Sequence, residues 1–210
     1  FCPYPCIVIV HLNPALRPLP PFVWASIRES SGHGRPVNLI TQKPHPSLER
    51  TGLEYGRVRL HDVKPYERSA KLRRFLLSYR PITAFGNGTG WYHHVMKRWY
   101  VLEQFVVLHA LRGVLNLDTD AVLLRDVRPI VRSLVPDVCD AILPMDEHSA
   151  SIDYRKGIWS FSPHTMYFTA PVIPEYTDFA AWLFTTPAPV HAMRSRLNRT
   201  WLPIDDMAPW

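Results

Sequence analysis

The sequence predicts an α/β fold with a mainly parallel β-sheet flanked by helices. Short apolar runs rich in β-branched residues alternate along the chain with longer segments in which apolar residues recur at helical spacing. Strands that alternate with helices are typical of parallel sheets, because each helix carries the chain back to start the next strand in the same direction.

The first half of the chain is predicted to contain three strands and two helices. Residues 7–10 form a β-branched run typical of a fully buried strand. Several prolines then delay the first helix, which apolar spacing predicts at 22–29. A second strand is predicted at 37–41, and apolar–polar alternation at 57–63 indicates a third, more exposed strand. The amphipathic, basic segment 66–79 is predicted to be a helix.

The second half begins with the strongest helical pattern of the chain, at 91–111, where apolar residues keep helical spacing until Gly113. An apolar strand at 114–117 follows, and Pro129 favours the start of a short helix at 127–135. Weaker patterns predict strands at 123–127, 141–144 and 166–170 and a helix at 176–184.

Charge and hydropathy limit the function classes. The formal net charge is +6 and the isoelectric point is about 9.4, so the surface should attract an anionic ligand such as a nucleotide diphosphate. The basic residues are scattered and no recognition motif accompanies them, which argues against nucleic acid as a partner. No apolar run approaches the roughly 18 residues that span a bilayer.

The apolar run at 114–117 ends in two carboxylates, Asp118 and Asp120. Side chains of a strand alternate between faces, so both carboxylates point the same way. Like charges held together repel each other unless a cation lies between them. Carboxylate oxygens suit Mg²⁺ or Mn²⁺, which also bind phosphate oxygens. The pattern predicts a divalent metal site and a phosphate-bearing substrate; its alternative is a pair of turn aspartates.

The stretch 98–122 resembles the GT-A glycosyltransferases. It has an amphipathic helix with Arg98 near its start, followed by Val-Leu-Asn-Leu-Asp-Thr-Asp at 114–120. The resemblance implies a GT-A, Rossmann-like sheet. It also implies that Asp118 and Asp120 form the Asp-x-Asp motif, whose Mn²⁺ or Mg²⁺ holds the diphosphate of a nucleotide-sugar donor.

The same resemblance suggests roles for residues outside the acidic motif. A basic residue near the start of the helix, Arg98 or Lys97, would contact the sugar or phosphate of the donor. The end of the first strand, His11 to Asn13, would face the nucleotide base. Near the end of the chain, Asp206 would be an acceptor-side base.

The resemblance also suggests how the chain is divided. Residues 1–210 are expected to form a single GT-A-like catalytic domain, truncated at one or both ends. Residues 1–144 would bind the nucleotide sugar, and 145–210 would form the acceptor side. A third metal ligand is not identified by the sequence; its candidates are His148, His164, His191, Asp205 and Asp206.

The predicted function is metal-dependent transfer of a sugar, hexosyl or pentosyl, to a hydroxyl of a glycan, protein or lipid acceptor. One alternative is a phosphohydrolase of the haloacid dehalogenase type, in which Asp118 would attack phosphorus and Asp120 would be the general acid and base. That motif normally lies on the first strand, whereas here about 100 residues precede it. The other alternative is a degenerate GT-A-like domain that binds without turnover.

Two features, the sequons and the start of the sequence, suggest the secretory pathway. Asn87-Gly88-Thr89 and Asn198-Arg199-Thr200 are glycosylation sequons. The sequence begins with Phe1, so an N-terminal anchor or signal is expected to have been removed. The sequence leaves undecided whether Cys2 and Cys6 form a disulfide bond. We therefore expect a glycoprotein of the Golgi lumen, attached to the membrane only through such an anchor.

Overall fold

A computed structural model describes residues 5–12, 21–31, 36–42, 58–79, 89–119, 121, 123, 126, 128–134, 140–142 and 165–186. These residues contain a six-stranded sheet with the strand order β3-β2-β1-β4-β6-β5. The strands are β1 (Cys6–His11), β2 (Val37–Thr41), β3 (Val58–Asp62), β4 (Gly113–Leu117), β5 (Ala141–Ile142) and β6 (Thr165–Thr169). β1, β2, β3 and β4 are parallel, whereas β6 is antiparallel to β4 and β5. The predicted fold class, a mainly parallel sheet flanked by helices, is confirmed.

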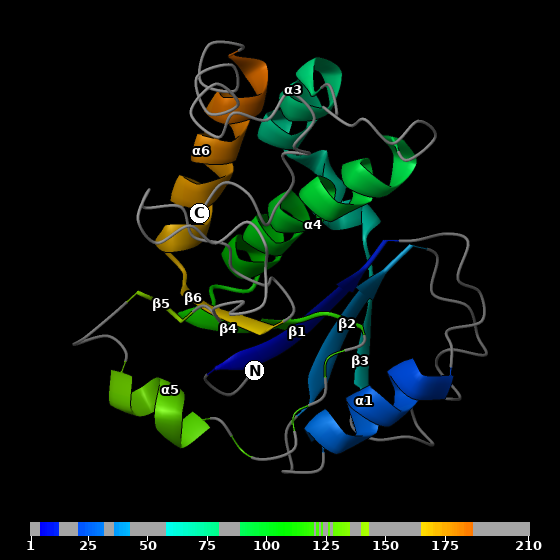
Figure 1. Ribbon diagram of the computed structural model, residues 1–210, viewed down its shortest axis with the longest axis vertical. Helices are drawn as coiled ribbons and strands as arrows, with labels where there is room; N and C mark the ends of the chain where they lie inside the picture. The colour runs from blue at the N-terminus through cyan, green and yellow to red at the C-terminus, as the bar shows by residue number, and fades with distance from the viewer. Residues whose placement is uncertain are drawn as a thin grey trace, which may run out of the picture.

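Helices cover both faces of the sheet. They are α1 (Pro21–Ser31), the 3₁₀ helix η1 (Lys64–Arg68), α3 (Ala70–Ser78), α4 (Thr89–Leu108), α5 (Arg128–Leu134) and α6 (Val172–Thr185). Figure 1 shows α3, α4 and α6 above one face and α1 and α5 below the other. The described part of the chain is therefore a three-layer α/β/α sandwich. None of its helices has the length and apolar character needed to cross a bilayer.

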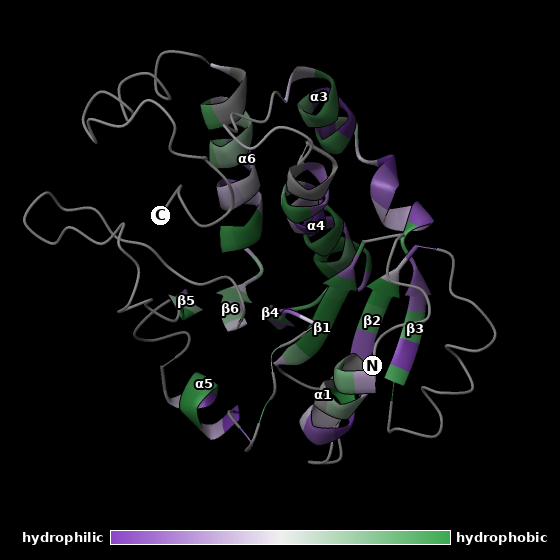
Figure 2. Ribbon diagram, turned by 45° about the vertical axis from the view of Figure 1, so that its right-hand side comes forward, coloured by the Kyte–Doolittle hydropathy of each residue, from purple (hydrophilic) through white to green (hydrophobic). Residues whose placement is uncertain are grey.

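The alternation of strand side chains divides the core into two clusters. Val8 and Val114 point toward α4 and pack with Trp99, whereas Ile7 and Leu115 point toward α1 and α5. β1, β2 and β4 are buried along most or all of their length, but the edge strand β3 is partly exposed, as its alternating sequence predicts. Figure 2 shows the same contrast in hydropathy between β1 and β3.

The single helix predicted at 66–79 is wrong in one respect, because the structure divides this segment into η1 and α3. The break lies at Ser69, whose backbone leaves the helical region with φ −58° and ψ 129°. Its hydroxyl accepts a hydrogen bond from the backbone N–H of Leu72 at 3.4 Å and so caps α3. A serine that caps a new helix competes with continuation of the previous one.

The second half differs from the prediction in three places. The predicted strand at 123–127 is not formed at Leu123 or Asp126, the two positions of that segment that the structure describes. α6 begins four residues before the predicted helix. α4 ends at Leu108 and not at Leu111, because Ala110 has a φ of +48°, which no α-helix accommodates.

Candidate functional site

The strand order places the candidate site at a topological switch point. From β1 the chain proceeds to β2 and β3 on one side, and then β4 pairs with the other side of β1. In open α/β sheets, ligands bind beyond the carboxyl ends of the strands where the order reverses. His11 is the last residue of β1, and Asp118 directly follows β4. Two of the predicted site residues therefore lie at the one edge where ligands gather in this kind of sheet.

Asp118 forms an ion pair with Arg98 of α4. The Nη1 of Arg98 donates to Oδ1 of Asp118, and the two side chains are only 12% and 19% exposed. The guanidinium carbon also lies 5.1 Å from the ring centroid of Trp99, which holds the arginine from a second side. α4 thus places the positively charged guanidinium of Arg98 beside the carboxylate of Asp118 at the switch point.

The structure shows which of the two basic residues, Arg98 or Lys97, reaches the predicted site. Lys97 points to η1, where its Nζ lies 2.5 Å from Oε1 of Glu67. Arg98 is one residue further along α4 and meets Asp118. Residues adjacent on a helix do not share a face, so only one of the two can reach the carboxyl end of β4. Arg98 is the residue brought to the predicted site.

His11 and Asp118 share an edge of the sheet but not a face. Ile9 of β1 pairs with Leu117 of β4, and both belong to the core cluster facing α1. His11 is two residues after Ile9, so strand alternation places it on the same face, whereas Asp118 is one residue after Leu117 and faces α4. His11 is 7% exposed. The two residues would therefore border a ligand at the strand ends from different sides.

The other predicted site residues lie outside the described residues. These are Asn13, Asp120 and Asp206, together with the candidates for a third metal ligand, His148, His164, His191 and Asp205. Their roles stay predictions.

The described residues supply part of what a divalent cation requires. Asp118 offers hard oxygen donors at the strand ends, which suit Mg²⁺ or Mn²⁺. Nowhere in the described ranges do three His, Cys, Asp or Glu side chains form a group that could hold a metal ion. Arg98 already neutralises the carboxylate, so a cation that binds Asp118 must compete with the guanidinium.

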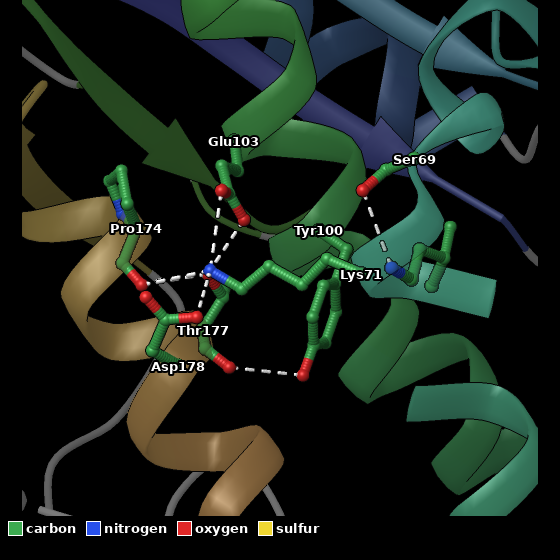
Figure 3. A network of polar contacts seen from close by, with 8 residues as sticks. Ser69, Lys71, Tyr100, Glu103, Pro174, Thr177 and Asp178 are labelled. Carbon is green, nitrogen blue, oxygen red and sulfur yellow. Dashed lines mark hydrogen bonds and ion pairs between the residues drawn. The ribbon is translucent and has the colours of Figure 1, made fainter. Parts of the chain in front are cut away.

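A polar network, shown in Figure 3, fixes α4, the helix that carries Arg98, against its neighbours. Nζ of Lys71 on α3 lies 3.3 Å from Oε1 of Glu103 on α4 and 2.7 Å from Oδ1 of Asp178 on α6. The hydroxyl of Thr177 on α6 donates to Oε2 of Glu103 at 2.6 Å. Burial is the main cause that raises the pKa of Tyr100, whose hydroxyl donates to the backbone carbonyl of Thr177 at 3.1 Å. The network joins three helices around one buried carboxylate.

Two polar residues near the site were not predicted to belong to it. Asn116 of β4 is 2% exposed and lies two residues before Asp118, on the same face of the strand. His94 lies one helical turn before Arg98 on α4, and burial, with the nearby Lys97, lowers its pKa. The signal for Asn116 was present in the sequence, because it is a lone polar residue inside an apolar strand.

The comparisons with known proteins concern the fold. No protein-family model and no curated protein matches the chain. A solved structure of an active-site mutant of LgtC is similar to it, with a TM-score of 0.54 and 13% identity, over 84% of this chain and 62% of that one. This chain therefore spans less than two thirds of the length of LgtC, which another solved structure describes as a galactosyltransferase.

Two other solved structures are more distant. The PaToxG glycosyltransferase has a TM-score of 0.44 and 10% identity, over 93% of this chain and 64% of that one. A cytidylyltransferase from Leptospira borgpetersenii serovar Hardjo-bovis has a TM-score of 0.45 and 10% identity, over 96% and 77%. These two scores carry no argument. The likeness to LgtC shows that the chain has a glycosyltransferase-like, GT-A fold.

Proposed function

We propose that this chain is a metal-dependent glycosyltransferase that moves a sugar from a nucleotide-diphosphate donor to an acceptor hydroxyl. The observation that carries the proposal is the pair of Arg98 and Asp118 at the switch point of a glycosyltransferase-like sheet. A carboxylate for a cation and a guanidinium for a phosphate are the two groups that a metal-bound diphosphate requires.

Each residue has a proposed role. Asp118 and Asp120 would hold Mn²⁺ or Mg²⁺, which when bound supplies positive charge to the departing diphosphate. The guanidinium of Arg98 donates hydrogen bonds to the donor phosphate or sugar. His11 and Asn13 border the base, and a later carboxylate accepts the proton of the acceptor hydroxyl on a glycan, protein or lipid. The sugar carries positive charge as its bond to the diphosphate breaks, and the acceptor oxygen then forms the new bond.

We also propose that the protein acts in the lumen of the Golgi. Cys6 is disulfide-bonded, and disulfides persist in oxidising compartments. The two sequons of the sequence are compatible with the same compartment.

Calorimetric titration of UDP and GDP, with and without Mn²⁺, tests the donor site. Wild-type protein should bind one of these two nucleotides, and it should do so only when Mn²⁺ is present. Asp118→Asn keeps an acceptor for Arg98 but removes the charge, so we expect its affinity to fall at least about tenfold, which corresponds to about 1.4 kcal/mol. Glu29→Gln is the matched control, because it removes an exposed carboxylate on α1 and should leave binding unchanged.

A result against Mn²⁺-dependent nucleotide binding would support the second candidate function, a degenerate domain that binds without turnover. A degenerate domain that binds no metal would keep the ion pair of Arg98 and Asp118 as a structural contact. If a folded wild-type sample binds neither nucleotide under any condition, the enzymatic proposal fails. If nucleotide binds equally well without Mn²⁺ and in Asp118→Asn, the chain is a metal-independent binding domain.

A further inference from the structure

Asn116 is a buried amide with an unused donor. The residue is 2% exposed, and its Nδ2 has no hydrogen-bond partner within the described part of the chain. The strand register places Val8 of β1 and Met166 of β6 beside it, and neither side chain contains an oxygen. An amide that is taken out of water without a partner costs stability, so a protein that keeps one invites a functional explanation.

A second asparagine of the same sheet, equally buried, shows the hydrogen bonds that a purely structural amide forms. Asn38 of β2 is also 2% exposed. Its Nδ2 donates to Sγ of Cys6 and to the carbonyl oxygen of Ile7, both at 3.2 Å, and its Oδ1 lies 3.0 Å from Nε2 of His61. Asn38 therefore has partners for both ends of its amide, whereas Asn116 leaves its donor end unused.

An acceptor lies two residues beyond Asn116. Asp118 follows on the same face, and alternate residues of a strand are roughly 6.7 Å apart along its axis. An asparagine and an aspartate that lean toward each other can bridge that spacing with one hydrogen bond. The carboxylate of Asp118 is instead held by Arg98 in this structure.

We propose that Asn116 is a positioning residue for Asp118. When a cation displaces Arg98 from Asp118, the Nδ2 of Asn116 donates to the released carboxylate and keeps it oriented toward that cation. The inference rests on the proposed function, since it assigns a new residue to the same site. It explains why a lone amide stands inside an apolar strand two residues before the first aspartate of the acidic motif.

Mn²⁺ titration of the intact chain, followed by the electron paramagnetic resonance signal of free Mn²⁺, tests the proposal together with urea unfolding. Partners that orient a metal ligand typically contribute 10- to 100-fold to metal affinity. We therefore expect Asn116→Leu to weaken Mn²⁺ binding by roughly tenfold or more. The same substitution should leave the urea midpoint unchanged or higher, because it removes an unpaired buried amide. A residue with only a structural role would not lower the affinity for Mn²⁺ while the urea midpoint stays unchanged or rises.

Asn38→Leu is the matched control. It removes the partners of Cys6, Ile7 and His61, so its urea midpoint should fall while the folded protein keeps the wild-type affinity for Mn²⁺. Where leucine at position 116 prevents folding, Asn116→Ala carries the same comparison with a smaller side chain.

A double substitution tests whether Asn116 acts through Asp118. In an Asp118→Asn background, Asn116→Leu should cause no further loss of Mn²⁺ affinity. An additional loss there, or equal Mn²⁺ affinity of wild type and Asn116→Leu, overturns the positioning role and leaves the proposed function intact. If folded wild-type protein binds no Mn²⁺, the proposed metal site fails first and the role of Asn116 falls with it.

Discussion

Single residues decide where α4 ends. Backbone N–H groups of Ala110 and Leu111 bond the carbonyls of Val107 and Val106 at 3.2 and 3.0 Å, which is the pattern of a Schellman motif. The residue in the left-handed conformation of this motif is usually glycine, but here it is Ala110 with a φ of +48°. The apolar spacing continues to Leu111, so the sequence pattern alone extends the helix too far.

The strain at this cap leads to the first prediction. Ala110→Gly should raise the free energy of unfolding by about 1 kcal/mol, because glycine adopts a positive φ without the steric cost that a Cβ imposes. Ala181→Gly, inside α6, is the control and should lower it by about the same amount. Urea unfolding of both variants measures the difference; a loss of stability in Ala110→Gly would contradict the assigned cap.

At the scale of elements, the helical layer is held by polar contacts as well as by apolar packing. α3, α4 and α6 share a buried apolar cluster whose aromatic members are Phe75, Tyr79 and Tyr100. The network around Glu103 lies beside this cluster and fixes the relative position of the three helices. Since Arg98 lies two residues before Tyr100 on α4, the site depends on contacts made far from the strand ends.

The second prediction concerns this network. Thr177→Val keeps the shape of the side chain but removes the hydrogen bond to Glu103 and the one to the carbonyl of Pro174. A hydrogen bond to a charged group contributes about 1.5–3 kcal/mol, so we expect the free energy of unfolding to fall by about 2 kcal/mol. Thr165→Val is a control near the start of β6, where the side chain is partly exposed.

The measurement for Thr177→Val is urea unfolding, supplemented by nucleotide binding. Affinity for the nucleotide should change little in the folded protein, because Lys71 still holds Glu103 and with it α4. Wild-type stability in Thr177→Val would show that the bond to Glu103 contributes nothing to the layer.

At the scale of the whole molecule, one polar chain connects β2 and β3 with η1 and the end of α4. His61 of β3 contacts Asn38 of β2 at 3.0 Å and the hydroxyl of Tyr66 at 3.3 Å, and this hydroxyl lies 3.1 Å from Nε2 of His109. Burial, with His109 and Arg59 nearby, lowers the pKa of His61 to about 4. The imidazole therefore stays neutral in the folded protein at pH values where an ordinary histidine is charged.

The third prediction is a pH dependence of stability. The pKa of His61 is about 4 in the folded chain and about 6.5 in the unfolded chain, so the unfolded chain binds the proton more readily. The contribution to stability is fully present above pH 6.5 and is lost as the pH falls toward 4. We expect a loss of roughly 2 kcal/mol for a half-buried ring.

Urea unfolding between pH 4 and 8 tests this dependence. His61→Gln keeps an amide donor for Asn38 but does not titrate, so its unfolding free energy should change less over the same range. An unchanged slope in this variant would assign the dependence to other groups, among them His94, whose pKa is also lowered.

The sequence by itself determined the fold class and most strands. β2 has the predicted bounds and β1 differs by one residue at each end, because a buried parallel strand needs a continuous β-branched run that is visible in the sequence. Helix ends were less predictable, since Ser69 and Ala110 interrupt patterns whose apolar spacing continues. These interruptions depend on local backbone conformation and not on hydropathy.

The tertiary structure decided which residues meet at the candidate site. The sequence offered Arg98, with Lys97 as the alternative, and only the packing of α4 across the strand ends separates them. The sequence likewise showed Asn116 as one polar residue in an apolar run. Only the structure shows that its Nδ2 has no hydrogen-bond partner among the described residues. Side-chain pairs that join β4 to α4 span about 20 residues, and their geometry depends on how the layers pack. A sequence specifies the groups available for chemistry, whereas their distances come from the folded layers.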